Sequence, residues 1–192
     1  LFTATFRADG SSKFAPNHHW GYFPAAAAAW RISDEPWMKG TQDWLSNLKL
    51  RLSVGASGND DIDASLFETI WEEEIIEVNG QQVTTYKPGD IMANPGLKWQ
   101  TTKKFNIGIT SSFLGDRLNV NLDYYNEKTV DMLIDRSLPP SSGATSVKAN
   151  LGSQTSNGFE FSVWGKIIRT KDWEWNLSVN GLHSKTTINS IS

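Results

Sequence analysis

Three features common in proteins are missing from this 192-residue sequence: cysteine, a long apolar run and a block of like charges. Without cysteine there are no disulfides, thiolate metal sites or thiol nucleophiles. No run approaches the roughly 18 apolar residues that a transmembrane helix needs. The formal net charge is only −3 and there is no basic stripe, so we expect no nucleic-acid partner. The first residues lack the basic and apolar regions of a signal peptide and instead read as a strand, which suggests a piece of a longer protein.

Motifs for catalysis and metal binding are missing as well. The sequence has no nucleophile-elbow serine, no phosphate-cradling glycine loop and no HExxH motif. His18 and His19 are adjacent, so an extended backbone points them to opposite faces, and no third ligand lies at metal spacing. Glu72, Glu73 and Glu74 form a consecutive run, which we interpret as a solvated loop and not as opposed catalytic carboxylates. We therefore expect no enzyme activity, no cofactor and no metal.

Strict alternation of apolar and polar residues dominates what is present. Leu48, Leu50 and Leu52 share one parity, while Lys49 and Arg51 share the other. A period of two predicts a strand with one apolar and one polar face. The same pattern predicts strands over residues 2–7, 20–31, 48–55, 105–113, 118–125, 159–167 and 173–180.

The segment WGYFPAAAAAW, residues 20–30, is ambiguous. Alanine has the best helix propensity and proline suits the first helical turn, so the local sequence allows a short helix. Alternation instead puts Trp20, Tyr22 and Trp30 on one face, with aromatic residues at both ends of the row. Ten residues of a tilted strand rise roughly 25 Å, the height of the apolar band of a membrane barrel. We predict a membrane-spanning strand, with a bulge at Pro24 because proline cannot donate a ladder hydrogen bond.

Short and long connections alternate along the chain. Residues 115–117 and 169–172 form short turns, whereas residues 8–19, 57–98 and 131–157 form long loops rich in Gly, Ser, Asn, Asp and Pro. Asn, Ser, Thr and Gly dominate the polar parity, which suits a hydrated interior. This organisation predicts an all-β fold: part of an antiparallel up-and-down transmembrane β-barrel, to which the chain supplies seven or eight strands. The alternatives are a soluble β-sandwich and a mixed fold in which the alanine run is helical.

Six motifs carry a resemblance to a known family. In order they are RADGSSKFAPNHHWGYFPAAAAAWRIS, LKLRLSVGASGND, NPGLKWQTTKKFNIGI, FLGDRLNVNLDYYNEKTVDML, LPPSSGATSVKANLGSQTSNGFEFSV and WEWNLSVN. Through them, residues 1–192 resemble part of the C-terminal half of the barrel domain of SusC/RagA-type TonB-dependent outer-membrane transporters.

The resemblance implies a 22-stranded barrel in the outer membrane of a Gram-negative cell, filled by an N-terminal plug. The plug and the remaining strands are not in this sequence. It also implies energy supplied through the TonB complex, a SusD-like surface lipoprotein as partner, and a glycan or an oligopeptide as substrate.

Positions on such a barrel predict three sets of residues. Aromatic residues at the ends of the apolar rows are expected to form the two membrane girdles: Trp20, Tyr22, Trp30, Trp99, Phe113, Tyr124, Phe159 and Trp173. Polar residues of the opposite parity are expected to face the plug or the solute path: Asn106, Asn119, Asn121, Asp123 and Glu160. In the longest loop, Trp71 and Tyr86 either stack on sugar rings or peptide side chains, or pack the loop against its neighbours.

We therefore predict the barrel component of a TonB-dependent importer, which moves its solute without covalent chemistry. A secreted carbohydrate-binding β-sandwich is the alternative, and a glycan hydrolase the third hypothesis. The sandwich would be favoured if the apolar side of the strands packs against a second layer of this chain.

Overall fold

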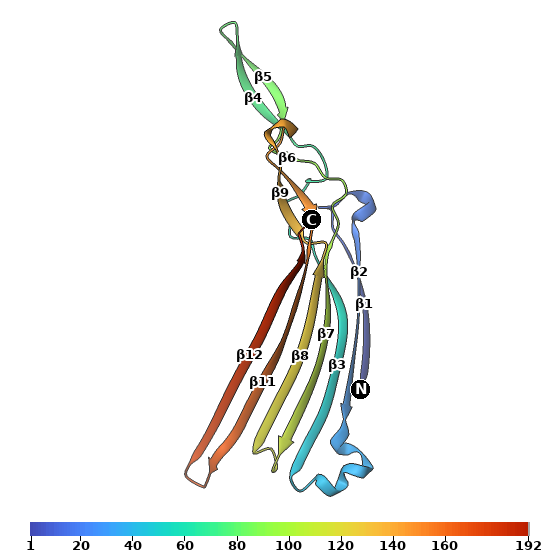
Figure 1. Cartoon of the computed structure of the whole chain (residues 1–192), viewed down its shortest axis with the longest axis vertical. Helices are drawn as coiled ribbons and strands as arrows, with labels where there is room; N and C mark the ends of the chain where they lie inside the picture. The colour runs from blue at the N-terminus through green and yellow to red at the C-terminus, as the bar shows by residue number, and fades with distance from the viewer. Residues whose placement is uncertain (192) are drawn as a thin grey trace.

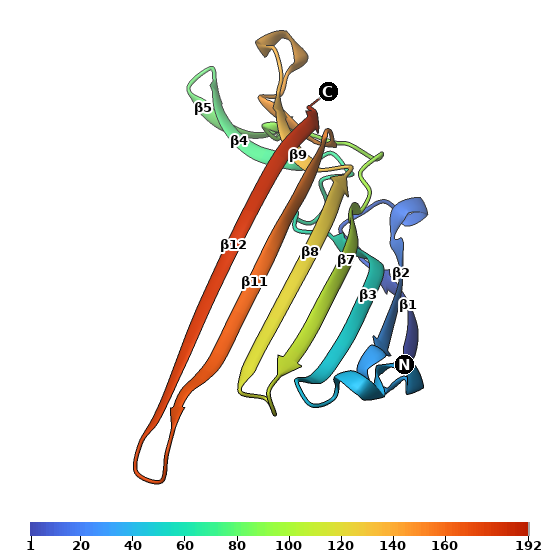
Figure 2. The ribbon, with the colours of Figure 1, turned by 60° about the horizontal axis from the view of Figure 1, so that its bottom comes forward.

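The computed structural model describes residues 1–191, most of which form one long antiparallel sheet with the loops gathered at one end (Figure 1). Its seven strands follow the order β1 (Phe2–Gly10), β2 (Trp20–Arg31), β3 (Leu45–Asn59), β7 (Gln100–Phe113), β8 (Leu118–Val130), β11 (Ser153–Arg169) and β12 (Glu174–Ser190). Strands adjacent in the sheet are consecutive along the chain apart from small loop strands, so the predicted up-and-down architecture is confirmed. Within residues 1–191 the sheet does not close, and β1 and β12 lie at its opposite edges (Figure 2).

The alanine run is a strand and not a helix. In the paired register, Ala27 of β2 lies between Thr3 of β1 and Ser53 of β3. Continuous pairing on both sides satisfies the backbone, which outweighs the weak helix preference of alanine. The mixed-fold alternative is therefore wrong.

The predicted bulge at Pro24 is also wrong, since the β1–β2 register runs without a shift. Leu1 and Ala29 exchange two hydrogen bonds of 2.8 Å, so odd-numbered residues of β2 bond to β1 and even-numbered ones face β3. The β2–β3 ladder ends at the pair Ala25–Gly55, one residue short of Pro24. The N–H donor that Pro24 lacks would face β3 beyond the end of this ladder, so the proline interrupts no pairing.

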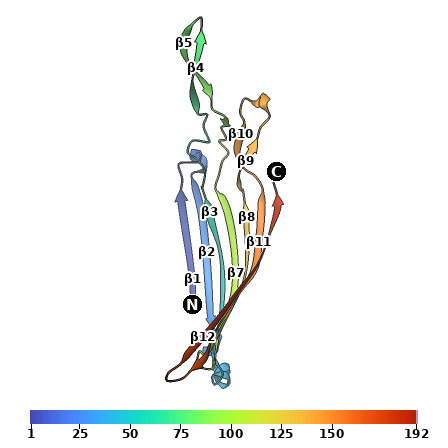
Figure 3. The ribbon, with the colours of Figure 1, turned by 90° about the vertical axis from the view of Figure 1, so that its left-hand side faces the viewer.

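The two faces of the seven-stranded sheet differ sharply in chemistry. The apolar face carries rows of large side chains, among them Ile107, Leu122 and Phe161, which are 37%, 51% and 44% exposed. The polar face carries the alternate residues. Within residues 1–191 no second sheet or helix covers the apolar face (Figure 3), so the β-sandwich alternative finds no support.

The predicted long loops contain folded elements that the sequence analysis missed. A hairpin of β4 (Trp71–Val78) and β5 (Gln81–Pro88) projects beyond the sheet (Figure 1), joined by Asn79 and Gly80 at φ +53° and +79°. Positive φ at both positions is the requirement of a type I′ turn, for which Asn-Gly is the usual sequence. The run Glu72–Glu74 is exposed, as expected of a solvated segment, but it lies in strand β4 of the hairpin.

The remaining elements are short. A second small sheet consists of β6 (Ile91–Met92), β10 (Ser146–Asn150) and β9 (Leu133–Ser137). The 3-10 helices are η1 (Pro16–His18), η2 (Ile32–Asp34), η3 (Pro36–Thr41) and η4 (Pro140–Ser142). In the described part of the chain no helix is long and apolar enough to cross a membrane.

The buried core lies among the loops and not in the sheet. Phe14 of the β1–β2 connection and Leu97 of the β3–β7 connection are fully buried, and they pack with Ile62 and Leu66, which also belong to the β3–β7 connection. This cluster ties the β1–β2 and β3–β7 connections into one cap at the loop end. An apolar core gives these long connections a stability that loops rarely have.

Residues 1–192 expressed alone are expected to aggregate in detergent-free buffer. The apolar face stays uncovered, and β1 and β12 offer unpaired edges to other chains. Analytical ultracentrifugation with and without a mild detergent measures this. A monodisperse, cooperatively unfolding chain without detergent would contradict the expectation.

Replacing Phe14 with alanine is expected to loosen the loop cap. Removal of a buried aromatic ring costs about 3–5 kcal/mol, and here the loss falls on the cluster and not on the strands. In the full-length protein, hydrogen exchange should accelerate in residues 11–19 and 60–70 and stay unchanged in β7 and β8. Leu114→Ala, at an exposed position of the opposite end, is the control and should leave the cap protected.

Candidate functional site

An ion pair crosses three strands on the polar face. Arg51 of β3 lies opposite Gly108 of β7, which lies opposite Asp123 of β8. The Nη2 of Arg51 donates to both carboxylate oxygens of Asp123, at 3.0 and 2.8 Å. A Cβ at Gly108 would collide with Oδ1 of Asp123 and lie 2.8 Å from Nη2 of Arg51, so any larger residue would force these two side chain ends to shift. The charges of Arg51 and Asp123 thus neutralise each other within the sheet.

Beside this ion pair lies a hollow of about 400 Å³ with a mixed lining, in which polar side chains are joined by Phe161, Gly181 and Leu182. Glu160 of β11 faces Asp123 directly across the strands, and it forms no salt bridge within residues 1–191. The rest of the lining includes Asn121, Ser162 and Asn180. Amide, hydroxyl and carboxylate groups together can donate to and accept from a polar solute or a neighbouring protein segment.

The structure thus brings together three of the predicted lumen residues, Asn121, Asp123 and Glu160, and leaves two apart. Asn106 lies on the other side of the ion pair, where it borders a smaller hollow of about 240 Å³. Asn119 lies at the turn end, where its Oδ1 accepts from Ser112 Oγ at 2.6 Å. Asn119 therefore supports the β7–β8 turn.

The alanines of β2 shape the polar face as well. Ala25 and Ala27 lie beside Ser53 and Gly55 of β3, and with Thr5 of β1 they border a hollow of about 350 Å³. Small side chains on three adjacent strands leave this space open. The hollow therefore depends on the small side chains of the alanine run, because bulkier residues at these positions would fill it.

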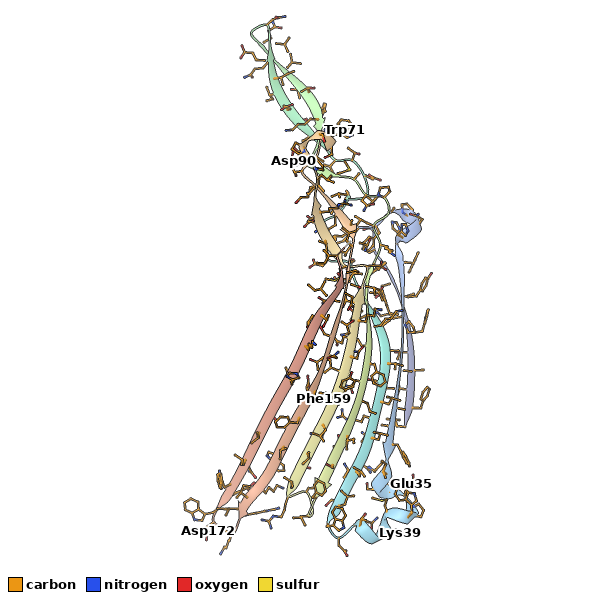
Figure 4. The ribbon with its side chains drawn as sticks, in the orientation of Figure 1. Glu35, Lys39, Trp71, Asp90, Phe159 and Asp172 are labelled. Carbon is orange, nitrogen blue, oxygen red and sulfur yellow. The ribbon has the colours of Figure 1, made fainter. Side chains whose placement is uncertain are left out.

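The predicted girdle aromatics lie at different heights on the sheet. Tyr22, near the loop end of β2, stacks on Phe6 with ring centroids 6.1 Å apart. Tyr124 and Phe159, whose ring centroids are 4.9 Å apart, lie near the middle of β8 and β11 and not at the predicted loop end (Figure 4). At the turn end Trp30 donates from Nε1 to Glu35, and the remaining members there are Phe113, stacked on Trp44, and Trp173 in the β11–β12 turn. Trp20 is 62% exposed at the loop end of β2.

Trp99 belongs to the loop cap and not to an apolar row of the sheet. Its Nε1 donates to the His19 carbonyl at 3.1 Å, and its ring packs against Phe14 and Phe23, both at 5.5 Å. Phe23 has the polar-face parity of β2, opposite to Tyr22. Trp99 therefore completes the loop cap, because residue 99 precedes the first paired residue of β7.

Trp71 and Tyr86 share one face of the projecting hairpin. Trp71 pairs with Pro88 and Glu73 with Tyr86, so all four side chains point the same way. The two aromatic side chains are 61% and 59% exposed, and Tyr86 donates its hydroxyl hydrogen to Glu73 at 3.2 Å. Trp71 lies at the base of the hairpin (Figure 4), where it also borders a hollow of about 450 Å³ between the hairpin base and the η4 turn.

Sequence reasoning missed Arg51 and Gly108 as parts of this wall. Alternation assigns both to the polar parity, but Arg51 and Asp123 are 72 residues apart and only the strand register brings them together. The hairpin, in contrast, had a signal in Asn79-Gly80. Within residues 1–191 no three His, Asp or Glu side chains gather as metal ligands.

Comparison with known proteins gives consistent matches. Residues 1–190 match the family model described as TonB dependent receptor-like, beta-barrel. TonB-dependent receptor P3 of Formosa agariphila is 36% identical over 187 residues, covering 96% of this chain and 18% of that protein. TonB-dependent receptor SusC of Bacteroides thetaiotaomicron is 36% identical over 186 residues, covering 94% of this chain and 18% of that protein.

Solved structures agree with these relatives. The RagAB peptide importer in its closed-closed state superposes with a TM-score of 0.88 at 27% identity, covering 99% of this chain and 20% of that one. Its open-open state gives a TM-score of 0.86 at 28% identity, with 97% and 20% coverage. The chain thus spans about a fifth of the length of the proteins it matches.

The Arg51–Asp123 pair is expected to couple the two strands modestly. In a full-length barrel refolded into lipid vesicles, a double-mutant cycle of Arg51→Gln and Asp123→Asn should give about 0.5–1 kcal/mol, because both groups are partly exposed. Gly108→Ala should abolish this coupling. Lys49→Gln with Asp123→Asn is the control, and a coupling as large there would contradict a specific pair.

Proposed function

Since this chain belongs to the TonB-dependent receptor-like β-barrel family, as a fragment of SusC/RagA type, we propose that it forms part of the wall of an outer-membrane nutrient importer. The observation that carries the proposal is the contrast between the faces. Large apolar side chains stay exposed on one side, while the other side pairs its own charges across strands. Lipid is the environment in which such an apolar face is stable.

The polar face then lines the lumen. We propose that Asn121, Asp123 and Glu160, which line one hollow, contact the plug or a passing solute, and that the hollow beside Ala25 and Ser53 gives either of them space. Because Arg51–Asp123 and Lys104–Glu127 pair four polar-face charges within the sheet, a solute there would meet hydrogen-bonding groups together with the carboxylate of Glu160. Such a surface allows movement without tight retention.

The substrate we propose is a glycan or an oligopeptide, held first at the loop end. The exposed faces of Trp71 and Tyr86 suit stacking on sugar rings or peptide side chains. RagAB, which is similar in structure, is named a peptide importer, and this supports an oligopeptide as one of the two proposed substrate classes. A SusD-like lipoprotein covering the loop end and the TonB complex acting through the plug complete the proposed machine.

Uptake by the full-length protein in cells is expected to require the proton gradient. Labelled oligosaccharides and oligopeptides are offered with and without a protonophore, and uptake of one class should stop when the gradient collapses. Transport that continues at the same rate would overturn the importer proposal.

The double variant Trp71→Ala, Tyr86→Ala is expected to weaken substrate affinity about tenfold, because two stacking contacts are lost. Isothermal titration with the purified transporter and the imported substrate measures the change. Trp37→Ala, at an equally exposed position of the turn end, is the matched control. Unchanged affinity in the hairpin variant would show that these rings serve another purpose.

A further inference from the structure

Two lysines oppose each other on the apolar face near the loop end. Lys103 of β7 pairs directly with Lys128 of β8, in the same parity as Ile107 and Leu122. Cβ atoms of directly paired residues are about 5 Å apart, and like charges at this separation repel. Both lysines are exposed, and neither forms a salt bridge within residues 1–191.

The neighbouring residues show that this arrangement is specific to one face. Lys104 and Glu127, each one position from the lysines, are paired residues on the polar face and approach to 3.5 Å. At the same height the wall is therefore charge-matched on the inside and doubly positive on the outside. An anion between Lys103 and Lys128 would remove the repulsion.

Further hydrogen-bond donors continue this basic rim across the sheet. One row nearer the middle of the apolar face, Asn126 pairs with Asn157, which pairs with Lys185 of β12. Amide and ammonium groups both donate hydrogen bonds to oxyanions. No Asp or Glu in the paired strands at these rows shares the apolar parity.

An apolar hollow lies directly toward the middle of the sheet from this rim. It measures about 420 Å³ and is lined on the apolar face by Ile107, Ile109, Leu122, Tyr124, Phe159 and Phe161. Along β8, Tyr124 lies four positions before Lys128, which is roughly 13 Å of strand. A cationic rim above an apolar hollow matches a molecule with an anionic head and a hydrocarbon chain.

We propose that Lys103 and Lys128, with Lys185, bind the phosphate of a lipid headgroup in the outer leaflet, whose acyl chain lies in this hollow. The proposal rests on the proposed function, which places this face in the outer membrane with the loops outside. Ammonium–phosphate contacts are charge-assisted hydrogen bonds, and each lysine near a charged lipid surface adds to attraction. The hollow makes a lipid the ligand instead of free phosphate, because a free ion gains nothing from it.

The test uses the purified full-length transporter in neutral detergent. Lys103→Gln with Lys128→Gln is compared with Lys39→Gln and Lys171→Gln, which removes the same charge at exposed turn-end positions. Binding of purified lipopolysaccharide, of its dephosphorylated form and of inorganic phosphate is followed by tryptophan fluorescence. The first variant should bind lipopolysaccharide about tenfold more weakly, and the control within about twofold of the unsubstituted protein.

Dephosphorylated lipopolysaccharide should bind the unsubstituted protein as weakly as intact lipopolysaccharide binds the variant. Equal losses in both variants, or tight binding of the dephosphorylated lipid, would overturn the proposal. Displacement of the lipid by inorganic phosphate at equal concentration would show an anion site without lipid character and would also overturn it. Uptake by cells that express each variant separates a failure of the lipid proposal from a failure of the importer proposal. Both variants should still transport if only lipid binding is affected.

Discussion

The structure depends on one constraint: a long antiparallel sheet leaves its apolar face uncovered by anything else in residues 1–191. In water such a face would bury itself against a second layer, as the sheets of a sandwich do. Here the backbone hydrogen bonds are made between neighbouring strands, so the solvent around the apolar face has to suit only the side chains. Hydrocarbon is the solvent that suits Ile107, Leu122 and Phe161, and an outer-membrane barrel is the setting that supplies it.

The polar face follows from the same constraint. Because the strands alternate, every side chain of the apolar face has a neighbour on the polar face, and the polar set must be stable around water without a packed core. The structure achieves this with charge pairs across strands, such as Arg51–Asp123 and Lys104–Glu127, and with small residues along β2 and β3. Stability at the loop end comes from a different source, the apolar cluster around Phe14 and Leu97. The wall and the cap are therefore stabilised by different forces.

Two adjacent basic residues of β7 differ in their electrostatic surroundings because they lie on opposite faces of the sheet. Lys104 faces a carboxylate on the inside, whereas Lys103 faces another lysine on the outside. Composition treats the two alike, and so does hydropathy. The pairing distinguishes a neutralised structural contact from a site that attracts an anion.

The sequence by itself determined the strands, their alternating faces and the ends at which long and short connections lie, because a period of two is a local property of the backbone. It also contained the Asn79-Gly80 turn signal, although the hairpin around it went unpredicted. Tertiary structure alone decided which residues meet: Arg51 with Asp123, Trp99 with Phe14, and Lys103 with Lys128. These contacts depend on register between strands and on the packing of distant loops. Both are set by pairing the whole sheet at once, so no local pattern records them.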